Sequence, residues 1–151
     1  MGHFLVIETS SGEIIRSEIS EIEAYDGPED KACHASKGRT QRTEVLYGPA
    51  GHWYVYLCYG VHWLLNVVTG PVDYPAAILI RGVGQWGGPG ILTRELGIDK
   101  SYNTLPARKA TGLWLEFNPD RNDDYRFTTG PRIGVDYAKE WAAKPYRFLK
   151  A

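Results

Sequence analysis

The sequence predicts a single α+β domain in which short, mostly antiparallel strands dominate and a few short helices connect them. The chain has 151 residues, which is enough for one domain with a hydrophobic core and too few for two comfortable ones. Hydrophobic residues make up 43% of it and charged residues 23%, as is ordinary for a folded domain. No apolar run approaches the length of a membrane span. Strand-like runs recur along the chain, and turn-forming residues separate them. Together these observations indicate one strand-rich domain.

The N-terminal third predicts two strands followed by a long loop. Residues 3–9 and 13–25 have the composition of strands, and the Ser-Ser-Gly sequence between them is typical of a turn. Residues 26–51 are rich in glycine, proline and charged side chains, so we expect mostly loop there. Proline favours the first position of a helix, and we therefore expect a short helix to begin at Pro28.

Residues 52–70 predict a hairpin whose turn lies at Tyr59 and Gly60. Short hairpin turns need positive φ angles, which glycine adopts readily and a large aromatic residue does not. Tyr59 is therefore an unusual residue for this position. Tyr56 and Asn66 share a face if the loop has three residues but not if it has two, and the sequence leaves both lengths open. A buried Asn66 in an otherwise apolar strand must find polar partners.

The second half of the chain predicts further short elements. We expect an α-helix over residues 87–98, with Gly97 as its C-terminal cap. A strand is expected over residues 75–83, and further short strands or extended segments over residues 112–117, 124–129 and 131–137. Residues 138–144 predict one or two helical turns.

The run GVGQWG, residues 82–87, matches the glycine spacing of a dinucleotide-binding loop. We reject that interpretation because Trp86 and a following Gly-Pro-Gly separate the glycines from the helix, and the neighbouring strands are predicted to be antiparallel. A conformational role, in which the glycines permit an unusual loop path, is favoured instead.

Charge and cysteine content narrow the classes of partner and compartment. The net charge is −1 at pH 7, whereas nucleic-acid-binding domains are usually basic, but a local basic cluster in residues 31–42 is compatible with such binding. The two cysteines form neither a disulfide framework nor a metal cluster. The N-terminus lacks the features of a secretory signal, so we expect a cytoplasmic protein with no membrane partner.

The histidines do not predict a metal site. His34, His52 and His62 are not at zinc-binding spacing with the cysteines or with each other, so we expect no metal ion and no cofactor. We expect His52 and His62 to make structural hydrogen bonds.

Glu21, Glu23 and Tyr25 alternate along one predicted strand and therefore share a face. The pattern alone favours a solvated acidic face on an edge strand. The functional interpretation places Glu23 at the mouth of a pocket as a general base.

Several runs, in this order, resemble the alkyladenine (3-methyladenine) DNA glycosylase family. They are EIEAYDGPEDKACH, GRTQRTEVLYGPAGHWYVYLCYGVHWLLNVV, AAILIRG, GPGILTRELGI and GPRIGVDYAKEW, and they span most of the chain. The resemblance implies one compact domain over residues 1–151, built on a curved antiparallel sheet with a protruding hairpin. Members commonly carry a helical segment before the first strand, and we expect this chain to lack it.

The resemblance implies that the protein removes damaged purines from duplex DNA, flipping each lesion out of the stack before cutting its bond to the sugar. The implied lesions are 3-methyladenine, 7-methylguanine and hypoxanthine, with ethenoadenine as a further candidate. The implied partner is duplex DNA, and we expect a monomer that is associated with the nucleoid if the source is bacterial.

The resemblance also assigns a role to each site residue. Glu23 matches the general base, and Arg81 and the backbone carbonyl of Ile133 match the groups that hold the attacking water. Tyr59 resembles the wedge that fills the space left in the duplex. The remaining matches form the base-binding pocket: Tyr25, His34 and Tyr56 as aromatic walls, and Asn66 as the residue that helps to reject guanine.

None of the matched pocket residues is a lysine that could form a Schiff base, so we expect a monofunctional enzyme that uses water and leaves an abasic site. The alternative is a non-catalytic module that stacks nucleic-acid bases on aromatic strands between basic loops. Such a module would need neither Glu23 nor Arg81. A third possibility, a relative that binds lesions without cutting, is disfavoured because the matched site residues are retained together.

Overall fold

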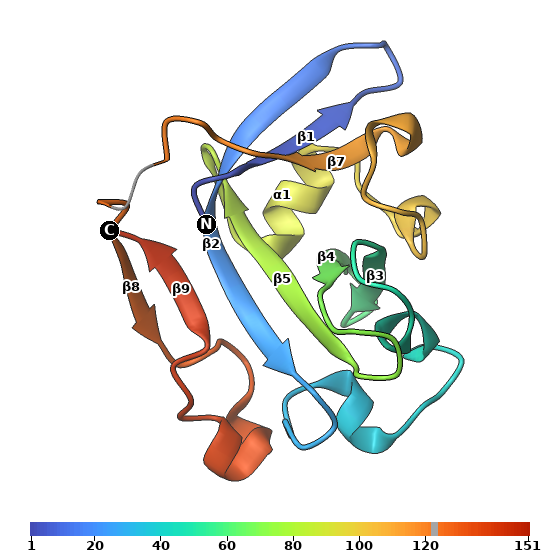
Figure 1. Cartoon of the computed structure of the whole chain (residues 1–151), viewed down its shortest axis with the longest axis vertical. Helices are drawn as coiled ribbons and strands as arrows, with labels where there is room; N and C mark the ends of the chain where they lie inside the picture. The colour runs from blue at the N-terminus through green and yellow to red at the C-terminus, as the bar shows by residue number, and fades with distance from the viewer. Residues whose placement is uncertain (122–123) are drawn as a thin grey trace.

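The computed structural model describes residues 1–121 and 124–151, and it confirms the predicted fold class. The described strands form one curled antiparallel sheet, with a single α-helix and several 3₁₀ helices around it (Figure 1). The strands are β1 (Phe4–Glu8), β2 (Ile14–Asp26), β3 (Trp53–Cys58), β4 (His62–Val68), β5 (Ala76–Val83), β6 (Trp86–Gly87), β7 (Leu113–Glu116), β8 (Phe127–Gly130) and β9 (Arg147–Lys150). The helices are α1 (Pro89–Glu95) and the 3₁₀ segments η1 (His34–Lys37), η2 (Glu44–Tyr47), η3 (Lys100–Tyr102), η4 (Lys109–Thr111) and η5 (Asp136–Trp141).

The long strand β2 organises the sheet, whose main path runs β3-β4-β5-β2-β1-β7. The first half of β2 pairs with β1, and its second half pairs with β5. The short strand β9 pairs with β2 opposite residues 21–23 and carries β8 on its other side, so Figure 1 shows β8 and β9 as a separate ribbon beside β2. Because β2 has a neighbour on both sides at Glu23, it is not the edge strand that the acidic pattern favoured.

Alternation along the strands separates the hydrophobic core from a cleft on the opposite side of the sheet. Val55, Leu65 and Ile80 belong to the main core, where α1 contributes Leu92. The neighbouring residues Tyr54, Asn66 and Leu79 face the opposite side of the sheet and line the cleft. The sheet therefore acts as a wall between the core and the candidate site.

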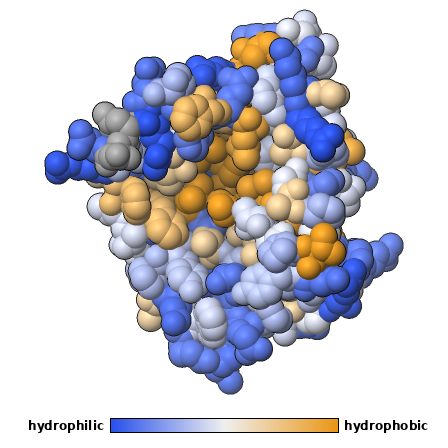
Figure 2. Space-filling view, viewed as in Figure 1, coloured by the Kyte–Doolittle hydropathy of each residue, from blue (hydrophilic) through white to orange (hydrophobic). Residues whose placement is uncertain are grey.

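A second, apolar hollow of about 310 Å³ lies on the core side of the sheet. Figure 2 shows apolar side chains gathered at the centre of this face, over β2 and β5. The residues that line the hollow are Met1, His3, Ile19, Ile22, Val67, Ile78, Ile80, Leu115, Glu116 and Phe117.

Local signals predicted several elements well. The helix α1 ends in a Schellman motif, because the Ile98 amide bonds to the Thr93 carbonyl and the Gly97 amide to the Arg94 carbonyl. Gly97 has a φ of 67°, which confirms it as the residue that closes the helix. The GVGQWG run forms an antiparallel turn between β5 and β6, so rejecting the dinucleotide loop was correct.

Other elements differ from the sequence predictions. No helix begins at Pro28, where the chain makes turns, and the first helical segment is η1. The strand predicted over residues 131–137 is wrong: this segment is a turn leading into η5 and bonds through Arg132 and Ile133 to other loops and to β2. The short strands β6 and β9 were not predicted. β9 depends on its pairing with the distant strand β2, whereas β6 has only two residues and folds back on the neighbouring strand β5.

Candidate active site

Pairing across the sheet brings the site residues into one transverse row. Asn66 lies opposite Tyr54 on β3 and opposite Leu79 on β5. Leu79 in turn pairs with Glu23, and Glu23 pairs with Arg147 on β9. Because paired residues point to the same face, this register aligns Tyr54, Asn66, Leu79 and Glu23 along the cleft floor and places Arg147 next to Glu23, outside the lining of the cleft.

The hairpin register resolves the question that the sequence left open. Cys58 pairs with His62, so the loop has three residues and Asn66 shares a face with Tyr56. Asn66 is buried, and its side-chain amide donates to the Tyr54 carbonyl at 3.1 Å.

The row forms the floor of a cleft of about 580 Å³. Every site residue expected from the sequence lines it: Glu23, Tyr25, His34, Tyr56, Tyr59, Asn66, Arg81 and Ile133. A cleft of this size has room for a group as large as a purine together with a water molecule.

Glu23 is fully buried at the inner end of the cleft, so the interpretation of a solvated acidic face is wrong. The Tyr25 hydroxyl donates to Glu23 Oε2 at 2.8 Å, and the Ile133 amide donates to Oε1 at 2.7 Å. Arg81 Nη1 lies 3.4 Å from the same Oε1. A carboxylate can accept about four hydrogen bonds, so Glu23 has capacity left for a further donor such as water.

Tyr25 is the protonated partner in its contact with Glu23. Burial raises the pKa of Tyr25, and the Glu23 carboxylate raises it further because a second negative charge beside it is unfavourable. The phenol therefore keeps its proton at neutral pH and donates a hydrogen bond to Glu23.

Arg81 is held by a second carboxylate on the same strand as Glu23. Its Nε donates to Glu21 Oε1 at 2.9 Å, and Arg147 Nε donates to that same oxygen at 2.6 Å. Burial raises the pKa of Glu21, but the hydrogen bonds from Arg147 and Arg81 outweigh it, and the net effect is a lowered pKa.

Aromatic rings form the other wall of the cleft. His34 and Tyr56 contact each other edge to face, with ring centroids 4.6 Å apart, and Tyr54 lies 5.2 Å from Tyr56. Nδ1 of His34 is 2.8 Å from the Tyr54 hydroxyl, which fixes the imidazole ring. The guanidinium of Arg42 lies over Tyr56, 5.1 Å from the ring centre.

His34 is neutral at physiological pH. Burial lowers its pKa to about 4, and the positive charges of Arg42 and Lys37 act in the same direction. A neutral imidazole carries one donor and one acceptor nitrogen, so His34 can read the polar edge of a bound molecule.

Tyr59 stands at the tip of the hairpin and is 90% exposed. Its φ of 52° places a non-glycine residue in the left-handed region, and Gly60 follows with a φ of 67°. The backbone thus holds a bulky ring outward at the mouth of the cleft.

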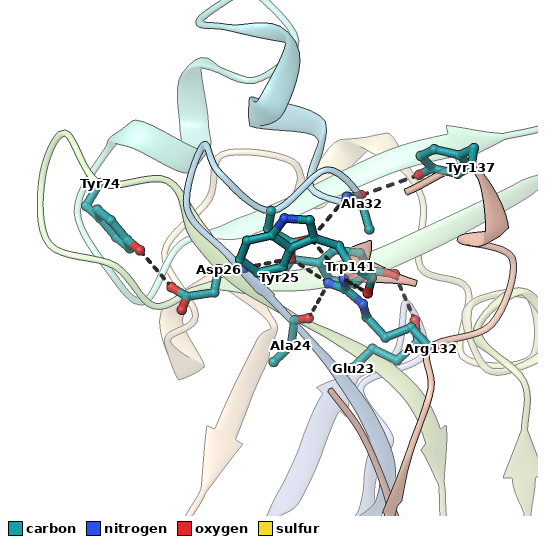
Figure 3. Close-up of polar contacts among 10 residues, drawn as sticks. Glu23, Ala24, Tyr25, Asp26, Ala32, Tyr74, Arg132, Tyr137 and Trp141 are labelled. Carbon is teal, nitrogen blue, oxygen red and sulfur yellow. Dashed lines mark hydrogen bonds and ion pairs between the residues drawn. The ribbon is translucent and has the colours of Figure 1, made fainter. Parts of the chain in front are cut away.

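A buried ion pair lies behind Tyr25 and holds the loop that carries Ile133 (Figure 3). Arg132 donates to both oxygens of Asp30, at 2.5 and 2.8 Å, and to the Ala24 carbonyl at 2.9 Å. Its guanidinium also lies over the Tyr25 ring, 4.7 Å from the centre. Figure 3 shows Arg132 beside Ala24 and the ring of Tyr25, so this side chain links the strand that carries Tyr25 to the loop that carries Ile133.

Comparison with known proteins identifies the family of this chain. Residues 1–87 and 85–151 match the model of the methylpurine-DNA glycosylase family (MPG). A protein of Myxococcus xanthus named "Putative 3-methyladenine DNA glycosylase" is 43% identical over 157 residues, covering 97% of this chain and 79% of that protein. One of Legionella pneumophila (strain Corby) with the same name is 41% identical, covering 98% and 83%.

The chain belongs to the methylpurine-DNA glycosylase family. This confirms the resemblance seen in the sequence and makes DNA the expected partner of the cleft. The concave site, with its aromatic walls and the buried carboxylate of Glu23, is consistent with an enzyme of this family.

The basic cluster expected to help a glycosylase bind DNA is only partly available. Arg39 donates to both oxygens of Glu44 and also to Asp73, so carboxylates already compensate its charge. Arg42 lines the cleft beside Tyr56, and Lys37 is exposed nearby. Of this cluster, Arg42 lies over Tyr56, and Lys37 acts electrostatically on His34.

Nδ1 of His52 lies 3.0 Å from the Pro49 carbonyl, as expected of a structural histidine, whereas His62 packs beside Gly90 at the edge of the cleft. Within residues 1–121 and 124–151, no group of three His, Cys, Asp or Glu is placed to hold a metal ion. No helix of that same part of the chain is long and apolar enough to span a membrane.

Sequence reasoning missed several residues around the site. Tyr54 could have been found, because it alternates with Tyr56 on one strand. The pairs Asp30–Arg132 and Glu21–Arg147 join residues more than 100 positions apart, and no local pattern links them.

Proposed function

We propose that this glycosylase hydrolyses the bond between sugar and base at damaged purines in duplex DNA, leaving an abasic site. The proposed lesions are 3-methyladenine, 7-methylguanine and hypoxanthine. The observation that carries the proposal is a fully buried Glu23 whose carboxylate keeps free acceptor capacity at the inner end of an aromatic cleft.

In the proposed reaction Glu23 acts as the general base. A water molecule beside Glu23 and Arg81, held also by the Ile133 carbonyl, attacks the anomeric sugar carbon while Glu23 accepts its proton. The bond from sugar to base breaks, and its electron pair leaves with the base; a neutral base such as hypoxanthine takes up a proton from water as it leaves. A cationic lesion departs as a neutral molecule and needs no acid, and the negative charge of Glu23 also stabilises the cationic sugar as it develops.

The aromatic residues are proposed to hold a base that has been flipped from the duplex. Tyr25, His34 and Tyr56 present ring faces and edges to the cleft, which suits the stacking of an electron-poor alkylated purine. Asn66 is proposed to crowd the exocyclic amine of guanine. Tyr59, exposed at the hairpin tip, is proposed to fill the space that the flipped base leaves.

Water as the nucleophile makes the proposed enzyme monofunctional. None of the described residues that line the cleft is a lysine, so no side-chain amine is placed to form a Schiff base there. Product analysis by gel should therefore give an abasic strand that breaks only after alkali treatment.

The test is single-turnover base release from duplexes that carry hypoxanthine, 3-methyladenine, 7-methylguanine or ethenoadenine. We expect Glu23→Gln to lower the rate roughly 10²- to 10⁴-fold while duplex affinity stays close to that of the parent. Glu18→Gln is the matched control, because Glu18 lies on the same strand and pairs with Lys150 outside the cleft. No release from any duplex by excess parent enzyme, with equal affinity for damaged and undamaged strands, would support a non-catalytic binding module instead.

A further inference from the structure

Two carboxylates and two guanidinium groups form a chain that begins outside the proposed site and ends at Glu23. Arg147 donates to Glu21, Arg81 donates to that same Glu21 oxygen, and Arg81 Nη1 reaches Glu23. The side chains of Arg81 and Glu21 are only about a tenth exposed, so water weakens these contacts little. The Arg147 side chain is 30% exposed and lies at the solvent end of the chain.

The geometry of Arg81 shows what Glu21 does for it. A guanidinium group that faces a lone carboxylate tends to bind it through two parallel hydrogen bonds. Here Glu21 occupies the Nε edge at 2.9 Å, and Glu23 meets only Nη1, at 3.4 Å. Glu21 thereby keeps Arg81 from pairing fully with Glu23, which would take up the acceptor positions that a water molecule needs.

The charges in this cluster balance. Glu21 and Glu23 are two positions apart on one strand face, which separates them by roughly 7 Å, and they repel each other. Arg81 and Arg147 supply one positive charge for each. Without Arg147, Glu21 would share Arg81 with Glu23 and the cluster would carry a net negative charge.

We propose that Glu21 and Arg147 are positioning residues that hold Arg81 end-on to Glu23 and balance the charges of the two carboxylates. This inference rests on the proposed function, because it assigns Glu23 the role of base. Neither residue touches the space where a substrate would lie, since Glu21 and Arg147 are absent from the described lining of the cleft. They act through Arg81.

The pH–rate profile distinguishes this role from a merely structural one. Removing the positive charge of Arg147 disfavours the ionised form of Glu23, so Arg147→Met should move the acidic limb of the profile to higher pH. Removing the negative charge of Glu21 favours the ionised form, so Glu21→Gln should move the limb to lower pH. At the distances involved, each shift should be about 0.5 to 1.5 pH units.

The other titratable and charged groups around Glu23 are not substituted in either variant, so they contribute the same charges to both profiles. They are Tyr25 on β2, Arg81 on β5, Arg132 with its partner Asp30 in the loops, and His34 and Tyr137 on the far side of the cleft.

The experiment measures single-turnover release of hypoxanthine from duplex DNA across pH for the parent, Glu21→Gln, Arg147→Met and the double variant. We expect the acidic limb to shift in opposite directions in the two single variants and to lie at its parental position in the double variant. In Arg147→Lys, which keeps the positive charge, the limb should also stay at its parental position. Each single variant should also lose roughly 10- to 100-fold in rate, as expected when a hydrogen bond to a charged group is lost. Lys150→Met is the matched control, because Lys150 also links β9 to β2 through an ion pair but faces Glu18.

The outcomes separate two failures. If the acidic limbs of all variants coincide with that of the parent, the positioning role is overturned and the proposed function stays intact. The same holds if Lys150→Met shifts its limb as much as the single variants do. No base release by the parent would overturn the proposed function itself. Circular dichroism across the same pH range checks that each variant is folded. If only a smaller fraction of a variant is active, its rate falls at every pH, but the acidic limb of its profile does not move.

Discussion

The buried pair of Arg132 and Asp30 offers a stability prediction that can be worked from the structure. Both side chains are fully inaccessible to solvent. Asp30 accepts two hydrogen bonds from Arg132 and one each from the Asp26 and Ala32 amides. Replacing Arg132 by methionine leaves a buried carboxylate with only the two backbone donors.

The expected loss is large because one partner of a dry ion pair is removed while the other remains. Such changes typically destabilise a protein by about 3–5 kcal/mol. Asp30→Asn should be milder, because Arg132 keeps the Ala24 and Trp141 carbonyls and the ring faces of Tyr25 and Tyr146. We therefore expect Arg132→Met to be the more damaging change. In a domain of this size its melting temperature should fall by roughly 10 °C.

Urea unfolding followed by tryptophan fluorescence measures both variants. Arg94→Met is the control, since the pair of Arg94 and Glu95 is largely exposed and should change stability by less than about 1 kcal/mol. A loss below about 1 kcal/mol for Arg132→Met, or the reverse order of the two variants, would refute the reasoning. Because Arg132 precedes Ile133, base release should also fall in the folded Arg132→Met protein.

Three further predictions concern the cleft and its rim. Tyr59→Ser should leave the melting temperature unchanged and slow base release from duplex DNA, and equal rates for variant and parent would exclude a wedge. Asn66→Ala should lose about 1 kcal/mol of stability with the hydrogen bond to the Tyr54 carbonyl, and should release some undamaged guanine, measured by chromatography of free bases. His34 has a folded-state pKa of about 4, below its unfolded value, so its contribution to stability is present above pH 6.5 and declines as the pH falls toward 4. After allowance for its partial exposure this decline should be about 1–3 kcal/mol, and His34→Gln should flatten it in urea titrations at several pH values.

The sequence predicted the elements whose signals are local. The end of α1 was readable because Gly97 adopts a left-handed φ that few other residues tolerate. The hairpin was readable from alternation, although its loop length needed the pairing of Cys58 with His62. β9 and the Ile133 loop were not readable, because contacts with β2 from the far end of the chain stabilise them.

The site residues were expected from resemblance, and the environment of the general-base candidate came only from the structure. A run of alternating glutamates is ordinarily a solvated face, and the local pattern favoured that interpretation for Glu21 and Glu23. It was wrong because β5 and β9 flank β2 and because Arg81 and Arg147 compensate the buried charge. Burial of this kind depends on partners that lie 60 and 126 positions away.

The ribbon of β8 and β9 also has a consequence for local unfolding. Residues 131–146 form the connection between these two strands, and β9 pairs with β2 opposite residues 21–23. Because this pairing is much shorter than that of β2 with β5, the ribbon should open as a unit before the rest of the sheet exchanges its amides. The Ile133 amide would then exchange with solvent sooner than those of β5. In that open form one wall of the cleft is missing, while the hairpin that carries Tyr59 stays in place.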